Sequence, residues 1–332
     1  MIEALPLIWA GVIAFGVTLY VLLDGFSLGV GILFPFVGAH EDRTLAMNSV
    51  APVWDGNQTW LVLGGAALFA AFPPAFNFLL GALYLPLMVM LVALIFRGAA
   101  FEFRYKAADS HGWDRAFAAG STIAAFCQGM VLGTYVTGFD IVAGHHGGGA
   151  FAWLTPFSLF TGLAVVGAYG LLGACWLVVK TEGPLQLRAR ELALRLLWVA
   201  LFSIAVVSIW TPFVEPAIAE RWFAWPNLFL LAPVPLLTAV CAIGLYLSLR
   251  RGGEVAPFAF TAALFLLTLA GLAISLWPWI VPRTMTVWEA AAAPKSQLFV
   301  LVGVAIIVPL ILIYTAHAYW VFRGKVDREL HY

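Results

Sequence analysis

Two carboxylates stand inside long apolar runs of the sequence, at Asp24 and Asp55. Inserting an ionisable side chain into a membrane span costs roughly 2.5–3.5 kcal/mol of free energy on insertion scales. Such a residue is therefore first considered a candidate for function. Carboxylates in such spans carry protons or bind a coupling cation. We therefore treat both acids as candidates for a proton path.

The neighbours of the two acids are polar or small. Gln58 follows Asp55 by three positions, so both side chains project from one helix face. Ser27 and three glycines follow Asp24 in the stretch DGFSLGVG, residues 24–31, and glycines of this spacing allow a second helix to approach closely. We expect a proton path through Asp55, with Asp24, Gln58 and Ser27 as further members. The alternative is that the acids only hydrogen-bond neighbouring helices or a partner subunit.

A second charged group closes the third apolar run, in RGAAFEFR at residues 97–104. Glu102 stands there between Arg97 and Arg104, which predicts an ion pair that anchors the helix end at the membrane interface. Near Asp55, three large or polar side chains are candidates for packing between helices. These are Trp54, Asn57 and Trp60.

Redox or metal chemistry by ligands of this chain is not expected. His317 is the only histidine inside an apolar run, so the chain cannot supply two histidines to a haem. The three cysteines have no C-x-x-C or Cys/His spacing. The pair His145 and His146 precedes three glycines and could bind a metal, but a flexible, exposed turn is the favoured interpretation. We predict no catalytic residue and no metal site in this chain.

The composition is that of a membrane protein. Of 332 residues, 63% are hydrophobic and 10% are charged, against roughly 45–50% and 25% in soluble domains. Too few polar residues remain to cover a water-facing surface. The formal net charge of zero gives no general attraction for nucleic acid. The apolar runs are continuous and lack the alternation of a β-barrel, so the fold class is an all-α integral membrane protein.

Nine runs are long enough to cross the hydrocarbon core, which takes about 20 residues. We expect one polytopic membrane domain over residues 1–332. Its helices one to four would lie within about 5–136, five to eight within about 156–280, and the ninth at about 297–322. The runs are 5–37, 48–72, 77–96, 115–136, 156–179, 193–213, 225–249, 258–280 and 297–322.

The basic residues predict the orientation of these spans. Fourteen lysines and arginines fall in one alternate set of connections, and the other set holds three. Since basic residues accumulate on the cytoplasmic side, the N-terminus is expected outside and the C-terminus in the cytoplasm. At 1.5 Å of rise per residue, Asp24 would lie in the cytoplasmic half of the first span. Asp55 would lie about 10 Å deep in a second span that begins near Asn48.

Three stretches are similar to motifs of a known family. Residues 24–31 resemble DGFDLGVG, residues 48–61 (NSVAPVWDGNQTWL) resemble NSIAPVWDGNETWL, and residues 97–104 are similar to RGVAFEFR. On these motifs the chain resembles subunit II of the cytochrome bd-type ubiquinol oxidases, including the cyanide-insensitive oxidases. One position departs from the pattern, because Ser27 stands where the family has a second aspartate.

The resemblance implies a haem-free subunit of a quinol:oxygen oxidoreductase in the inner membrane of a bacterium. It would not be catalytic alone. Haems b558, b595 and d would belong to subunit I, which this chain would stabilise. The implied fold has two four-helix bundles plus one peripheral helix. The acid that matches Asp55 lies on a proposed proton route in the family, and the tryptophan that matches Trp60 lies near a proposed oxygen route.

Further partners follow from the same resemblance: quinol in the complex, lipid around it, and small single-helix accessory subunits. Some family members also hold a structural quinone in this subunit. The alternative to an oxidase subunit is a proton- or ion-coupled secondary transporter that uses Asp24 and Asp55 as its coupling sites. Nine spans do not divide into two equal inverted repeats, which counts against the transporter. A purely structural scaffold differs from the first hypothesis only in the proton path.

Overall fold

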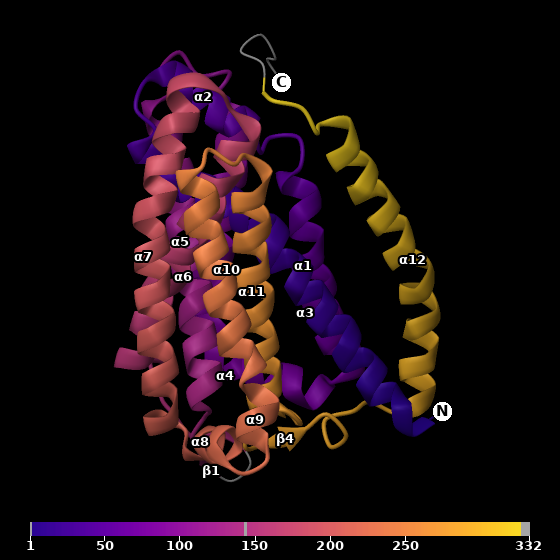
Figure 1. Ribbon diagram of the computed structural model, residues 1–332. Helices are drawn as coiled ribbons and strands as arrows, with labels where there is room; N and C mark the ends of the chain where they lie inside the picture. The colour runs from indigo at the N-terminus through magenta and orange to yellow at the C-terminus, as the bar shows by residue number, and fades with distance from the viewer. Residues whose placement is uncertain (1, 143–144, 327–332) are drawn as a thin grey trace.

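The computed structural model describes residues 2–142 and 145–326, and most of these residues are helical (Figure 1). Two short antiparallel strand pairs, β1–β2 and β3–β4, lie in connections between helices. The strands are β1 (Ile141–Val142), β2 (His145–His146), β3 (Trp279–Val281) and β4 (Met285–Thr286). The helices are η1 (Ile2–Ala4), α1 (Leu5–Leu33), η2 (Phe34–Phe36), α2 (His40–Asn48), α3 (Trp54–Ala71), α4 (Pro73–Phe103), α5 (His111–Thr137), α6 (Pro156–Lys180), α7 (Gly183–Val214), α8 (Pro216–Phe223), α9 (Asn227–Leu231), α10 (Pro233–Arg250), α11 (Val255–Leu276) and α12 (Pro294–Val321).

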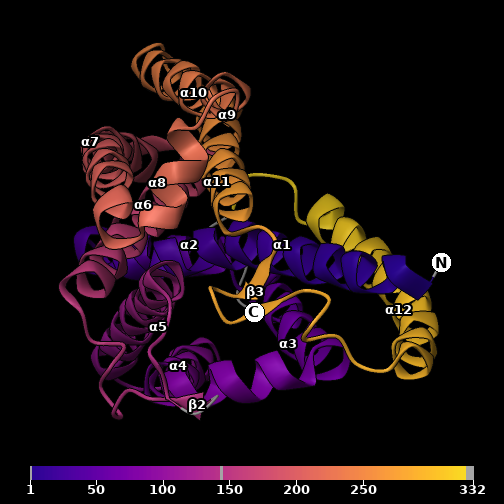
Figure 2. The same ribbon diagram turned by 90° about the horizontal axis from the view of Figure 1, so that it is seen from below.

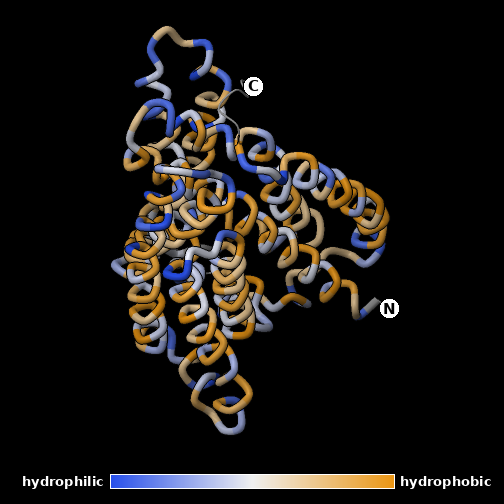
Figure 3. Tube along the Cα trace, turned by 45° about the horizontal axis from the view of Figure 1, so that its top comes forward, coloured by the Kyte–Doolittle hydropathy of each residue, from blue (hydrophilic) through white to orange (hydrophobic). Residues whose placement is uncertain are grey.

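Eight segments of the described chain are long and apolar enough to cross a membrane. They are α1 with η2, α4, α5, α6, α7, α9 with α10, α11 and α12. The most hydrophilic stretches lie mainly in the connections between helices (Figure 3). The finding supports a multi-pass membrane protein, while the predicted count of nine spans stays a prediction.

Among the helices that correspond to the nine predicted spans, α3 is the one outside this set, and it corresponds to the second predicted span. That span was expected to begin near Asn48. Instead α2 ends at Asn48, turns cover residues 49–53, and α3 begins only at Trp54 with 18 residues. Pro52 explains the interruption, since it lacks a backbone N–H and disfavours helical backbone at the residue before it.

The first long helix, α1, runs through the middle of the molecule. Seen from below, α3, α4 and α5 lie on one side of α1, and α6, α7, α10 and α11 lie on the other (Figure 2). Helix α1 contacts α3, α5 and α6 directly. Helix α12 stands apart and touches the rest of the protein mainly through α3 and α1 (Figures 1 and 2).

The glycines that follow Asp24 allow this central position, as the sequence predicts. A Cβ atom built on Gly29 would overlap the carbonyl oxygen of Tyr169 and lie 2.7 Å from the amide nitrogen of Gly173 in α6. A Cβ atom on Gly31 would overlap the Ser121 side chain of α5. The backbones of α1 and α6 are therefore in direct contact at Gly29 and Gly173, in the small-residue packing common between membrane helices.

The chain that follows α12 is tied back to the ends of α6 and α11. The Lys180 ammonium donates hydrogen bonds to the carbonyl oxygens of Phe322 and Gly324. Lys325 forms an ion pair of 2.9 Å with Glu254, and its hydrogen bond lowers the pKa of that carboxyl group. These contacts fix the far end of a helix that has few other neighbours within the chain.

Candidate functional site

A buried ion pair joins α1 to α4. Both side chains, Asp24 and Arg97, are completely buried. The guanidinium donates from Nη2 to Oδ1 of Asp24 at 2.8 Å and from Nη1 to Oδ2 at 3.1 Å. Nη2 also donates to the Ser27 hydroxyl at 2.5 Å. Paired hydrogen bonds between an arginine and a carboxylate fix both orientation and distance, so the pair clamps the two helices together.

The predicted ion pairs of Glu102 are wrong. Glu102 is exposed, whereas Arg97 and Arg104 are buried on other carboxylates. Helix geometry explains the difference. At 3.6 residues per turn, positions 97 and 104 lie on nearly the same face of α4, which points into the protein. Position 102 is rotated by about 140° from position 97 and faces away from it.

Arg104 instead takes part in a second ionic cluster at the same end of α4. Its Nε donates to Oδ1 of Asp114 at 2.6 Å, and Arg43 donates to Oδ2 of the same carboxylate at 3.3 Å. Asp114 lies in the first turn of α5 and Arg43 lies in α2. One carboxylate thus joins α2, α4 and α5 where these helices meet. Asp114 could not be singled out from the sequence, because its partners Arg43 and Arg104 belong to other helices.

A line of hydrogen-bonding side chains runs beside Asp24 across three helices. Gln128 of α5 donates to the hydroxyl of Tyr20 in α1 at 2.6 Å and accepts from the hydroxyl of Tyr169 in α6 at 2.9 Å. Tyr20 in turn hydrogen-bonds the Asp24 carboxylate. Sequence reasoning missed this line. The signal was available, because an amide in the middle of an apolar run must find partners.

Asp55 lies in a different environment from Asp24. Its side chain is exposed in the first turn of α3, and it makes no hydrogen bond or ion pair with any described residue. The predicted depth of about 10 Å assumed a helix that began at Asn48, and that assumption is wrong. Gln58 is half-buried, and its Nε2 atom is buried without a partner among the described residues. The structure therefore joins Ser27 to Asp24 through Arg97 and does not join Asp55 or Gln58 to them.

Asn57 connects three helices close to Asp55. Its side chain is buried, and Nδ2 donates to the carbonyl oxygen of Leu23 in α1 at 2.8 Å. Its Oδ1 atom accepts from the hydroxyl of Tyr319 in α12 at 2.9 Å. These two bonds tie the start of α3 to the helix that carries Asp24 and to the outlying α12.

The two tryptophans of this region pack against aromatic rings of other helices. Trp54 stacks on Phe101 of α4, with 4.7 Å between ring centroids. Trp60 is fully buried and meets Phe15 of α1 edge-on at 5.8 Å. The start of α3 is therefore held by aromatic packing as well as by Asn57, and Asp55 is the side chain of this turn that remains exposed.

Among the side chains that the structure describes, which exclude those of residues 141–146, no three histidine, cysteine, aspartate or glutamate residues come together as metal ligands. His317 lies exposed on α12, beside Trp320. The side chains of His145 and His146 fall outside the described part of the structure, so the interpretation of that turn stays a prediction.

The fold and the sequence define the family. A model of the cytochrome bd terminal oxidase subunit II family matches residues 5–322, and the chain belongs to this family. It is 29% identical to cytochrome bd-I ubiquinol oxidase subunit 2 of Escherichia coli strain K12, over 98% of this chain and 96% of that protein. It is 27% identical to cytochrome bd ubiquinol oxidase subunit 2 of Bacillus subtilis strain 168, over 93% of each chain.

Solved structures show the same fold. The bd oxidase structure from Geobacillus thermodenitrificans contains a chain that matches with a TM-score of 0.79 at 16% identity, over 96% of this chain and 97% of that one. Family membership and eight apolar helices together indicate a multi-pass protein of the bacterial inner membrane. Its homologues are subunits of a ubiquinol oxidase, and the resemblance noted on the sequence motifs is confirmed.

Proposed function

We propose that this chain is the haem-free subunit II of a bd-type quinol:oxygen oxidoreductase and acts only in complex with a haem-bearing subunit I. The observation that carries the proposal is the family match over residues 5–322. The histidine chemistry agrees, because a bis-histidine haem needs two inward-directed histidines, whereas His317, the one histidine inside an apolar run of the sequence, lies exposed on the outlying α12. Haems b558, b595 and d, the quinol, a structural quinone and accessory subunits are proposed on family resemblance alone.

We place subunit I against α3 and α12. None of the most apolar window of α12 is buried within the chain, and the helix keeps its position through Asn57 and the chain beyond it. Because α12 stands apart from the other helices, most of its apolar surface is left free to contact a partner. Its exposed apolar side chains include Phe299, Val302, Ile306, Leu310 and Ile313.

The finer topology belongs to the same proposal. Helix α3 would be the second span along the chain and would complete the set of nine, since it packs along α1 and contacts α4 and α12. The charge bias places the N-terminus outside and the C-terminus in the cytoplasm. On the family resemblance we also propose that the nine spans form two four-helix bundles and one peripheral helix.

For the proton path, we place the most weight on Asp55. Its carboxylate is exposed at the proposed partner face, next to the buried Asn57 and the half-buried Gln58. A carboxylate without a partner in its own chain can pass protons to groups of a second subunit, whereas Asp24 is occupied by Arg97. The same pairing weakens the transporter alternative, because Asp24 offers no free carboxylate to a coupling cation.

Asp55→Asn is expected to lower quinol oxidase turnover of the complex about tenfold or more, which corresponds to roughly 1.4 kcal/mol in the barrier. The amide keeps the size of the side chain but cannot carry a proton. Turnover would be measured as oxygen consumption per haem, with haem content expected to stay unchanged. Asp109→Asn is the matched control, since Asp109 is an exposed carboxylate in the connection before α5. Turnover equal to that of this control would remove Asp55 from the path.

A further inference from the structure

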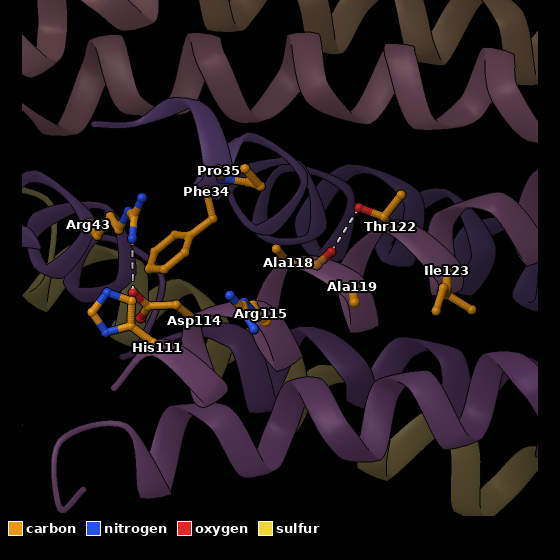
Figure 4. A pocket seen from close by; sticks show the side chains of 10 residues that line it. All are labelled: Phe34, Pro35, Arg43, His111, Asp114, Arg115, Ala118, Ala119, Thr122 and Ile123. Atoms are coloured by element: carbon orange, nitrogen blue, oxygen red, sulfur yellow. Dashed lines mark hydrogen bonds and ion pairs between the residues drawn. The ribbon is translucent and has the colours of Figure 1, made fainter. Parts of the chain in front are cut away.

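A hollow of about 650 Å³ lies along one face of α5, where this helix passes η2 and α2 (Figure 4). It lies at the end of the α5 span that the charge bias predicts to be cytoplasmic. Neither the ion pair of Asp24 nor the surroundings of Asp55 form part of it. It is lined by Phe34, Pro35, Arg43, His111, Asp114, Arg115, Ala118, Ala119, Thr122 and Ile123.

One end of the hollow is cationic. The arginines Arg43 and Arg115 lie there close to Asp114, with His111 beside them (Figure 4). Asp114 is the single acidic residue of the lining, and it already accepts hydrogen bonds from Arg43 and Arg104. Asp109, which pairs with His111, is a second carboxylate close to the hollow. Arg43, Arg104 and Arg115 still outnumber Asp114 and Asp109, which leaves an excess of positive charge.

Two arginines of the hollow have donor groups without a partner among the described residues. Arg115 is exposed and has no ion pair among the described residues. The Nε atom of Arg43 is buried and has no hydrogen-bond partner within the described chain. Arginine presents its donors in a planar fork that suits phosphate oxygens, so this end of the hollow is built for an anionic oxygen group.

The other end of the hollow is apolar. From His111 to Ile123 the lining follows one face of α5, which covers roughly 18 Å at 1.5 Å per residue. Ala118, Ala119 and Ile123 line this face. The hydroxyl of Thr122 donates to the carbonyl oxygen of Ala118 at 2.8 Å, so its proton is not available to a ligand. The hollow thus changes from cationic to apolar along a membrane-spanning helix.

We propose that this hollow binds one anionic phospholipid, with its phosphate at Arg43 and Arg115 and an acyl chain along the apolar face of α5. Basic pockets at the ends of membrane helices bind anionic lipid headgroups. A free phosphate ion would leave the apolar part empty, and a zwitterionic lipid would bring its own ammonium group to the arginines. Helix α5 lies on the opposite side of the molecule from α12 (Figures 1 and 2), so the site does not overlap the proposed face for subunit I or depend on the proposed function.

Native mass spectrometry of the purified complex, delipidated and then titrated with phosphatidylglycerol, tests the proposal. Arg115→Gln is expected to weaken the tightest binding step about fivefold, the effect of one arginine near an anionic lipid surface. Ala119→Phe should weaken it without changing the charge, because Ala119 is an exposed residue of the apolar wall. Arg251→Gln is the matched control and should bind as the wild type does, since Arg251 is an exposed arginine outside the hollow.

Three outcomes would overturn the proposal. The first is equal lipid affinity in Arg115→Gln and Arg251→Gln. The second is retention of phosphatidylcholine as strongly as phosphatidylglycerol. The third is displacement of phosphatidylglycerol by inorganic phosphate at similar concentration, which would indicate a simple anion site.

Discussion

Replacing Gly29 with alanine is expected to destabilise the protein by more than about 3 kcal/mol, beyond the usual range for an overpacked interior. The added methyl group would meet the carbonyl oxygen of Tyr169 and the backbone of Gly173. Backbone atoms cannot move aside as the end of a side chain can, so α1 and α6 must separate. The yield of folded protein and its thermal unfolding in detergent would measure the effect.

Gly11→Ala is the matched control in the same helix. A Cβ atom at Gly11 would have nothing within 4 Å, and alanine favours helix over glycine by roughly 1 kcal/mol. We expect this variant to be as stable as the wild type or slightly more stable. If both variants unfold at the same temperature, α1 and α6 do not pack through Gly29.

Asp24→Asn is expected to lower the free energy of unfolding by roughly 3–5 kcal/mol, the range for breaking a buried ion pair from one side. The Arg97 guanidinium would remain fully buried with only neutral partners. Thermal unfolding in detergent, followed by tryptophan fluorescence or by the loss of the folded peak in size-exclusion chromatography, provides the measurement.

The double variant Asp24→Asn/Arg97→Gln distinguishes the interaction between the two charges from the other effects of each substitution. It removes both charges, so it should be more stable than Asp24→Asn alone. Asp109→Asn is the control, because Asp109 pairs with His111 where both side chains are largely exposed, and surface pairs contribute little. The free energy of unfolding of the double variant would be compared with the two single variants. If its loss equals the sum of the losses in Asp24→Asn and Arg97→Gln, the two residues act independently and do not form a stabilising pair.

The sequence was most informative where short-range chemistry decides the structure. The glycines after Asp24 predicted close helix packing, and Gly29 lies against Gly173 as expected. Continuous apolar runs predicted nine spans, and eight of them correspond to helices that are long and apolar enough to cross a membrane. The weaker prediction concerned the start of α3, where Pro52 interrupts a run that looked continuous.

The partners of charged groups could not be predicted, because they join segments far apart in the chain. Asp24 and Arg97 are separated by 73 positions and meet only after α1 and α4 have packed. The local pattern instead suggested Glu102 as the partner of Arg97, although helix periodicity places these two residues on different faces. The partners of Gln128 could not be predicted for the same reason. A polar side chain in an apolar run must have partners, but Tyr20 and Tyr169 belong to two other helices.

We infer that this chain serves a haem-bearing oxidase without binding haem itself. The most direct measurement is affinity purification of the tagged chain from its native membrane, followed by a reduced-minus-oxidised absorption spectrum. The same spectrum would be recorded for the chain expressed alone. We predict haem b and haem d bands, together with quinol oxidase activity, only where a second subunit co-purifies. Full haem bands from the chain alone, or a native preparation without any haem-bearing partner, would show that the chain is not a haem-free oxidase subunit.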